Sequence, residues 1–140
     1  MKVMLVRPKP HKNSLGLSDL MTCEPLELEY VSSLVKSEGH DVILIDMMLE
    51  KKKLGYFVKK YEPDIVSFTS YITHVNVIKN YSKEVKNINK KIVTVVGRST
   101  QWGDSRGFYW WKYRLHIRNQ WYGEYGNFIR LFEEQQKSSI

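Results

Sequence analysis

Apolar and polar positions alternate in blocks along the first hundred residues, and the blocks predict strands and helices in turn. Short apolar runs between charged or turn residues predict buried strands at 3–6, 41–46, 64–68 and 91–97. Apolar residues spaced by three and four predict helices between these strands, at 26–38, at 49–61 and from Thr73 through Ile88. The first hundred residues therefore predict a regular alternation of strand and helix.

The first helix has the clearest boundaries. Pro25 suits the first turn of a helix, and Gly39 stands where a glycine commonly follows the last turn. We expect its apolar residues to form one stripe, made of Leu26, Leu28, Tyr30, Val31, Leu34 and Val35.

Strands separated by helices pair in parallel, and right-handed crossovers place helices on both faces of the sheet. The predicted fold class is therefore α/β, a three-layer flavodoxin-like (Rossmann-like) parallel sheet of about five strands with helices on both faces. A fifth strand is expected at 113–118 and a terminal amphipathic helix at 128–136. We predict that residues 1–140 form a single domain.

Such sheets bind ligands at the carboxyl ends of their strands, so the informative loops begin after Val6, Phe68 and Val96. The first of these loops lacks the glycine-rich turn of a dinucleotide site and the hydroxyl-rich phosphate loop of flavodoxins. The loop after the third strand offers Thr69 and Ser70 in place of a phospho-accepting aspartate. These absences argue against three common classes of doubly wound protein.

Four motifs in order point to a further class. They are MKVMLVRPKP, EPLELEYVSSLVKSEGHDVILID, EPDIVSFTSYITHVNVIKNYSKEV and KKIVTVVG. Together they resemble the N-terminal cobalamin-binding domain of radical-SAM enzymes, of the anaerobic Mg-protoporphyrin monomethyl ester cyclase and methyltransferase kinds. The resemblance covers residues 1–97.

The resemblance implies a cobalamin site and no catalytic residue. Its implied cofactor-binding residues are Pro8, Lys9, Thr69, Ser70, Tyr71 and Gly97. The second glycine of the family's usual pair is replaced by Arg98, whose side chain is expected to enter the groove for the cobalamin tail. The Asp-x-His-x-x-Gly motif is missing around His11, so we expect cobalamin to bind without a histidine below the cobalt, and we predict no metal-ligating residue.

The resemblance also implies a partner. A radical-SAM domain needs three cysteines for its 4Fe-4S cluster and binds S-adenosylmethionine, whereas this chain has the single cysteine Cys23. We therefore expect the radical-SAM domain to lie outside this chain, which would not be catalytic alone. The lone cysteine and the lack of a long apolar run favour a cytoplasmic location without membrane contact.

Residues 98–127 do not fit the pattern. All four tryptophans lie there, and most of its basic residues are arginines, whereas lysine predominates before residue 98. Residues 98–130 carry six basic and two acidic residues, in a chain of net charge +7. Because tryptophan has a single codon, this segment can be translated back and shifted by one base. The shifted frame permits a glycine pair, an apolar strand and a glycine loop, which favours a frame-shift hypothesis. As printed, the segment favours instead an Arg/Trp-rich nucleic-acid-binding or scaffold module.

Overall fold

The computed structural model describes residues 1–9, 25–70 and 75–98, which form strands and helices in alternation. In chain order the elements are β1 (Lys2–Arg7), α1 (Leu26–Ser37), β2 (Asp41–Asp46), α2 (Leu54–Tyr61), β3 (Ile65–Ser70), α3 (Val75–Ile88) and β4 (Val93–Arg98). The alternation predicted for this part of the chain is confirmed. The strand expected at 113–118 and the helix expected at 128–136 lie outside the described residues.

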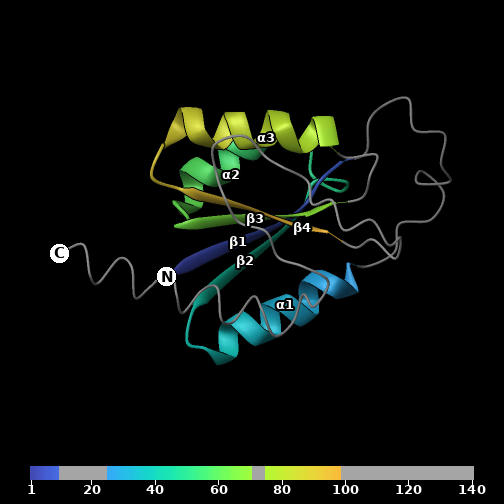
Figure 1. The fold of residues 1–140 in the computed structure, drawn as a ribbon, viewed down its shortest axis with the longest axis vertical. Coiled ribbons are helices and arrows are strands. Elements are labelled where there is room, and N and C mark those ends of the chain that lie inside the picture. The colour runs from blue at the N-terminus through green and yellow to red at the C-terminus, as the bar shows by residue number, and fades with distance from the viewer. Residues whose placement is uncertain (10–24, 71–74, 99–140) are drawn as a thin grey trace, which may run out of the picture.

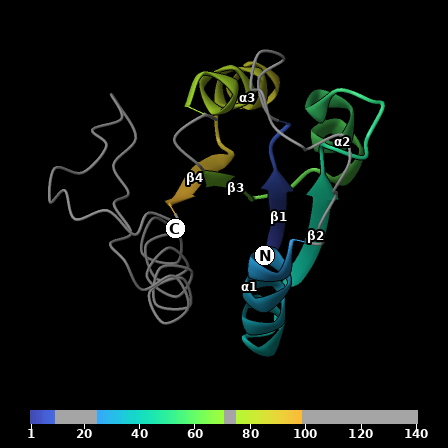
Figure 2. The same ribbon diagram turned by 90° about the vertical axis from the view of Figure 1, so that its right-hand side faces the viewer.

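The strands form one parallel sheet in the order β2-β1-β3-β4. Helix α1 covers one face of the sheet, and α2 and α3 cover the other (Figures 1 and 2). This arrangement confirms the predicted three-layer flavodoxin-like class, with four strands in the described residues. None of the helices in this part of the chain is long and apolar enough to cross a membrane.

Each face of the sheet has its own apolar core. Strand β1 serves both, because Val3 and Leu5 pack toward α1 while Met4 and Val6 pack toward α2 and α3. All four side chains are fully buried. A strand buried on both faces has a continuous apolar sequence, which explains why the apolar runs predicted the strands well.

Helix α1 corrects one prediction. Leu28, Val31 and Val35 are buried as expected, but Leu26 and Tyr30 are 60% and 68% exposed. Successive helical residues are rotated by about 100°, so Leu26 and Tyr30 lie on a different side of the helix from the buried set. The expectation of a single stripe was therefore wrong. Gly39 follows the helix with a φ of 84°, as predicted for a glycine at that position.

Helix α2 begins five residues later than predicted, at Leu54 rather than Leu49. The Asp46 carboxylate accepts a hydrogen bond from the Met48 backbone at 2.9 Å, and the Asp46 carbonyl accepts one from the Leu49 backbone. This turn competes with a helix, and three consecutive lysines follow it. The helix ends as predicted before Pro63, with Glu62 in the left-handed conformation at φ 47°.

Glu84 of α3 stabilises the start of α2. Its Oε1 accepts a hydrogen bond from the Gly55 backbone at 2.9 Å, whereas Lys53 at the N-cap provides no side-chain bond. A carboxylate at this position pairs with an otherwise unbonded backbone N–H and with the positive end of the helix dipole. Gly55 permits the approach, because a Cβ there would lie 2.6 Å from Glu84 Oε1.

We expect Glu84→Ala to lower the free energy of unfolding by about 1–2 kcal/mol, because α2 loses its only carboxylate cap among the described residues. Urea unfolding followed by circular dichroism measures this change. The matched control is Lys83→Ala, an exposed position on the same helix, which should change stability by less than about 0.5 kcal/mol. Equal effects of the two variants would contradict the capping role.

Candidate functional site

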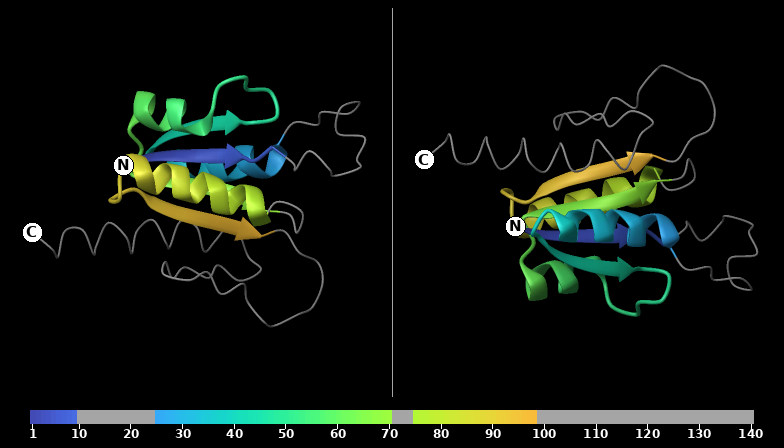
Figure 3. Two further views of the ribbon diagram at one scale, coloured as in Figure 1. Left: turned by 90° about the horizontal axis from the view of Figure 1, so that it is seen from above. Right: turned by 90° about the horizontal axis from the view of Figure 1, so that it is seen from below.

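All four strands are parallel, so their carboxyl ends meet at one edge of the sheet (Figure 3). The strand register pairs Arg7 with Asp46 and Thr69 with Gly97. Strands β1 and β3 pair Val6 with Phe68, so Arg7 and Thr69 occupy the next rung. Asp46, Arg7, Thr69 and Gly97 therefore form one row across the edge of the sheet, which we call the edge row.

The edge row lies on the face covered by α1. Side chains alternate between the two faces along a strand, and Leu5 and Val95, two residues before Arg7 and Gly97, pack against α1. Two residues further in along each strand, on the same face, the register aligns Leu44, Leu5, Ser67 and Val95, which we call the inner row. From the edge row to the inner row this face thus changes from charged and polar positions to apolar ones, with Ser67 as the exception.

Two buried hydroxyls on this face have no hydrogen-bond partner. Ser67 is fully buried and Thr69 is 2% exposed, and neither Ser67 Oγ nor Thr69 Oγ1 is hydrogen bonded to the protein. Leaving a buried hydroxyl unbonded costs about 1–3 kcal/mol, and such groups in folded proteins usually have a partner. Two of them on alternate residues of one strand place unused hydrogen-bonding groups on the α1 face of the sheet.

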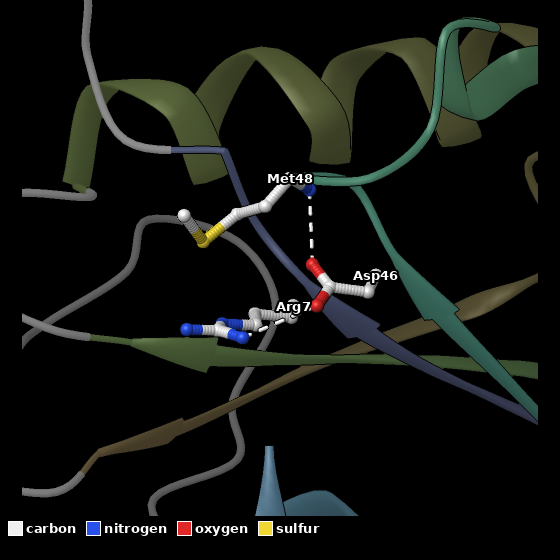
Figure 4. A network of polar contacts seen from close by, with 3 residues as sticks. All are labelled: Arg7, Asp46 and Met48. Carbon is white, nitrogen blue, oxygen red and sulfur yellow. Dashed lines mark hydrogen bonds and ion pairs between the residues drawn. The ribbon is translucent and has the colours of Figure 1, made fainter. Parts of the chain in front are cut away.

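Arg7 and Asp46 form an ion pair at the edge row. Arg7 Nη1 lies 3.1 Å from Asp46 Oδ2, and Asp46 Oδ1 accepts the Met48 backbone bond (Figure 4). The Arg7 side chain is 20% exposed and that of Asp46 is 9% exposed. Both carboxylate oxygens are thus engaged, which fixes the carboxylate and through it one end of the guanidinium.

The predicted loop residues Pro8 and Lys9 lie elsewhere. Pro8 is buried and Lys9 is exposed, and the chain after β1 turns toward the layer of α3 (Figure 2). The Lys9 backbone forms a hydrogen bond with the Tyr81 hydroxyl of α3, and the Tyr81 ring stacks on Phe68 at a centroid distance of 6.1 Å. Pro8 and Lys9 therefore lie on the α3 side of the sheet, whereas the Ser67 and Thr69 hydroxyls lie on the α1 side.

Burial raises the pKa of Tyr81, and the hydrogen bond from the Lys9 backbone opposes part of that rise. The folded protein therefore holds the phenol proton more tightly than the unfolded chain does. The resulting stabilisation is complete below the ordinary tyrosine pKa of about 10 and is lost as the pH rises through the higher folded-state pKa. Stability measured by urea unfolding should fall less steeply in this alkaline range for Tyr81→Phe than for the wild type; parallel pH profiles would contradict this.

The other predicted site residues are only partly described. Ser70 pairs with Arg98 at the last rung, and Tyr71 lies outside the described residues, as do Cys23, His11, His74 and His116. His40 is at the opposite edge of the sheet, where its Nδ1 lies 3.5 Å from the amino terminus.

Among the described residues, no group of three His, Cys, Asp or Glu side chains could hold a metal ion. The expected intrusion of Arg98 into the groove stays a prediction.

The sequence did not single out Arg7, Asp46 and Ser67 as site residues. The clearest signal was Ser67, a polar residue inside an otherwise apolar buried run. A second feature that the sequence motifs did not include is the lysine-rich segment 51–91. It has ten lysines and three acidic residues, a net charge of +7. Surface depressions lie between α2 and α3 and on α1, and neither is lined by an edge-row residue.

Comparisons with known proteins show the family of this chain. A family model described as "B12 binding domain" matches residues 15–98, more than half of the chain. An uncharacterized methyltransferase of Pyrococcus horikoshii is 34% identical over 100 residues, covering 69% of this chain and 21% of that protein. Hopanoid C-3 methylase of Methylococcus capsulatus is 30% identical over 101 residues, covering 69% of this chain and 19% of that protein. The chain thus spans about a fifth of the length of these relatives.

Proposed function

This chain belongs to the family of B12-binding domains, and we propose that it holds cobalamin on the α1 face of its sheet. The observation that carries this placement is the pair of unbonded buried hydroxyls, Ser67 and Thr69, beside Gly97. The nucleotide tail of cobalamin combines a flat apolar base with polar ribose and phosphate groups. A face that is apolar inside and polar at its edge suits that combination.

Within this site the residues have different proposed roles. Ser67 and Thr69 donate hydrogen bonds to nitrogen or oxygen atoms of the tail, and Gly97 leaves space for it. Cobalamin, when bound, supplies methyl-transfer or redox capacity at its cobalt, while the protein supplies position and surroundings. Ser70 and Tyr71 remain proposed contacts by resemblance, and Pro8 and Lys9 are proposed to shape the neighbouring loop.

We propose that the cobalt has no protein histidine below it. The motif that would supply one is missing after β1, and His40 lies at the far edge of the sheet. Electron paramagnetic resonance of bound cob(II)alamin tests this directly, because a lower nitrogen ligand splits the cobalt signal and a water ligand does not. Nitrogen splitting that disappears in His11→Ala or His74→Ala would contradict the proposal.

We propose further that this module serves a radical-SAM catalytic domain in a longer cytoplasmic protein. In support, both relatives are about five times longer than the matched region and are named for methyl transfer. The single cysteine here leaves the 4Fe-4S cluster and S-adenosylmethionine to that other domain. The test is the complete source gene: it should encode a Cys-x-x-x-Cys-x-x-Cys motif after this region, and a full-length protein without one would refute the partnership.

The same gene tests the frame-shift hypothesis. The family match ends at Arg98, where the tryptophan- and arginine-rich segment begins. We expect the gene, read one base forward over 98–127, to encode a second glycine and an apolar fifth strand. Codons that exclude both features would refute the hypothesis and leave the nucleic-acid-binding or scaffold alternative for this segment.

Titration with hydroxocobalamin, followed by visible absorption, tests the binding itself. Two chains are titrated in parallel: the printed chain, and a restored-frame chain in which residues 98–127 are replaced by the translation read one base forward. The comparison is needed because this segment begins at the last residue of β4, Arg98. Saturable one-to-one uptake by the restored chain is expected. No uptake by either folded chain would refute the proposed function, and salt-sensitive binding of an oligonucleotide without corrin uptake would favour the alternative.

A further inference from the structure

Arg7 has a place in the edge row that neither the family match nor the sequence motifs assign to a ligand. The match begins at residue 15, after β1. Strand register sets Arg7 between Asp46 on β2 and Thr69 on β3, on the face where the unbonded hydroxyls lie. A ligand that reaches the Thr69 hydroxyl therefore lies on the strand next to that of Arg7.

The guanidinium is held in place before any ligand arrives. Asp46 contacts it at 3.1 Å, and the Met48 backbone fixes the other carboxylate oxygen at 2.9 Å (Figure 4). Arg7 Nη1 makes the contact with Asp46, and a guanidinium carries five N–H donors in a rigid fork. A tethered guanidinium loses less conformational freedom on binding an anion than a mobile side chain does.

The distribution of apolar, hydroxyl and charged side chains on this face indicates which part of a ligand would contact Arg7. Two residues in from the edge row, the Ser67 hydroxyl lies between the apolar side chains of Leu5 and Val95, and the Thr69 hydroxyl belongs to the edge row itself. Charge first appears at the edge, with Arg7 and Asp46. A tail that inserts its apolar base inward would leave its phosphate nearer the edge, in the row that holds the Arg7 guanidinium.

Resting on the proposed function, we propose that Arg7 binds the phosphodiester of the cobalamin nucleotide tail, with Asp46 as its positioning residue. Arginine pairs with phosphate through charge-assisted hydrogen bonds, which are stronger than neutral ones. The alternative role for the ion pair is to join the ends of β1 and β2 only. The side chains are only 20% and 9% exposed, so the pair does join β1 to β2, but that role alone would not distinguish cobalamin from a corrin that lacks the phosphate.

Cobinamide separates these roles, because it keeps the corrin ring and lacks the phosphate, ribose and base. We expect Arg7→Gln to weaken cobalamin binding by about ten- to a hundredfold and to leave cobinamide binding unchanged. Both affinities are measured by visible titration of the restored-frame chain. Lys2→Gln is the matched control, since Lys2 is an exposed cation at the other end of the same strand.

A second measurement does not depend on affinity. The ³¹P resonance of bound cobalamin should shift relative to free cobalamin in the wild type, and Arg7→Lys, which keeps the charge, should retain part of that shift. Equal weakening of cobalamin and cobinamide by Arg7→Gln, or an unchanged phosphorus resonance, would overturn the inference and leave the proposed function intact. Failure of the wild type to bind cobalamin would overturn both.

Discussion

Gly97→Leu is expected to raise the dissociation constant for cobalamin by about a hundredfold or more, close to abolishing uptake. Gly97 is buried and pairs with Thr69 in the edge row, so a leucine there would fill space beside the unbonded hydroxyls. Gly97→Ala should have a smaller effect in the same direction, because its side chain is one methyl group. The measurement is a hydroxocobalamin titration of the restored-frame chain and its variants.

Thr94→Leu is the matched control for the leucine variant. Thr94 is on the same strand, three residues earlier, so alternation places it on the face of α2 and α3. The Thr94→Leu variant should bind cobalamin as the wild type does. Circular dichroism and urea unfolding of each variant show whether it is folded, so that loss of binding through a blocked site can be told from loss through misfolding. Wild-type affinity in a folded Gly97→Leu protein would contradict the proposed position of the tail.

The double substitution Ser67→Ala, Thr69→Val should change stability and affinity in opposite directions. Without ligand, removal of two unbonded buried hydroxyls should raise the free energy of unfolding by about 1–3 kcal/mol. With cobalamin, loss of the same hydroxyls should weaken binding by about tenfold or more. Urea unfolding and visible titration provide the two readings.

This opposite response distinguishes a ligand site from an ordinary part of the core. Ser33→Ala serves as the control, because the Ser33 hydroxyl is exposed on α1 and donates to the Glu29 carbonyl at 3.1 Å. Ser33→Ala should change neither the free energy of unfolding nor the affinity for cobalamin appreciably. A double variant that loses stability without ligand would mean that the two hydroxyls already have partners in the folded chain.

The fold could largely be predicted from the sequence because its central strands, β1 and β3, are buried on both faces. Continuous apolar runs such as 3–6 are conspicuous, and the intervening helices determine parallel pairing. The errors arose where a local pattern competes with tertiary structure. Leu26 and Tyr30 fit a helical spacing but lie away from the sheet, and the turn made by Asp46 delays the start of α2.

The site was predicted less completely, because its geometry depends on register between strands that are distant in sequence. Family resemblance pointed to Thr69 and Gly97, which the register places side by side. Arg7 and Asp46 are separated by 39 residues, and only the pairing of β1 with β2 brings them together. The loop residue Lys9, chosen by its place after β1, is instead tied to Tyr81.

The most direct test of the account is a nuclear magnetic resonance titration of the ¹⁵N-labelled restored-frame chain with hydroxocobalamin. We predict that the largest amide shifts will occur at Arg7, Thr69 and Gly97 of the edge row and at Ser67, two residues further in on β3. The amides of the exposed lysines on α2 and α3, such as Lys59, Lys60 and Lys83, should change little. Shifts confined to α2 and α3, or no shifts at saturating cobalamin, would contradict a cobalamin site on the α1 face.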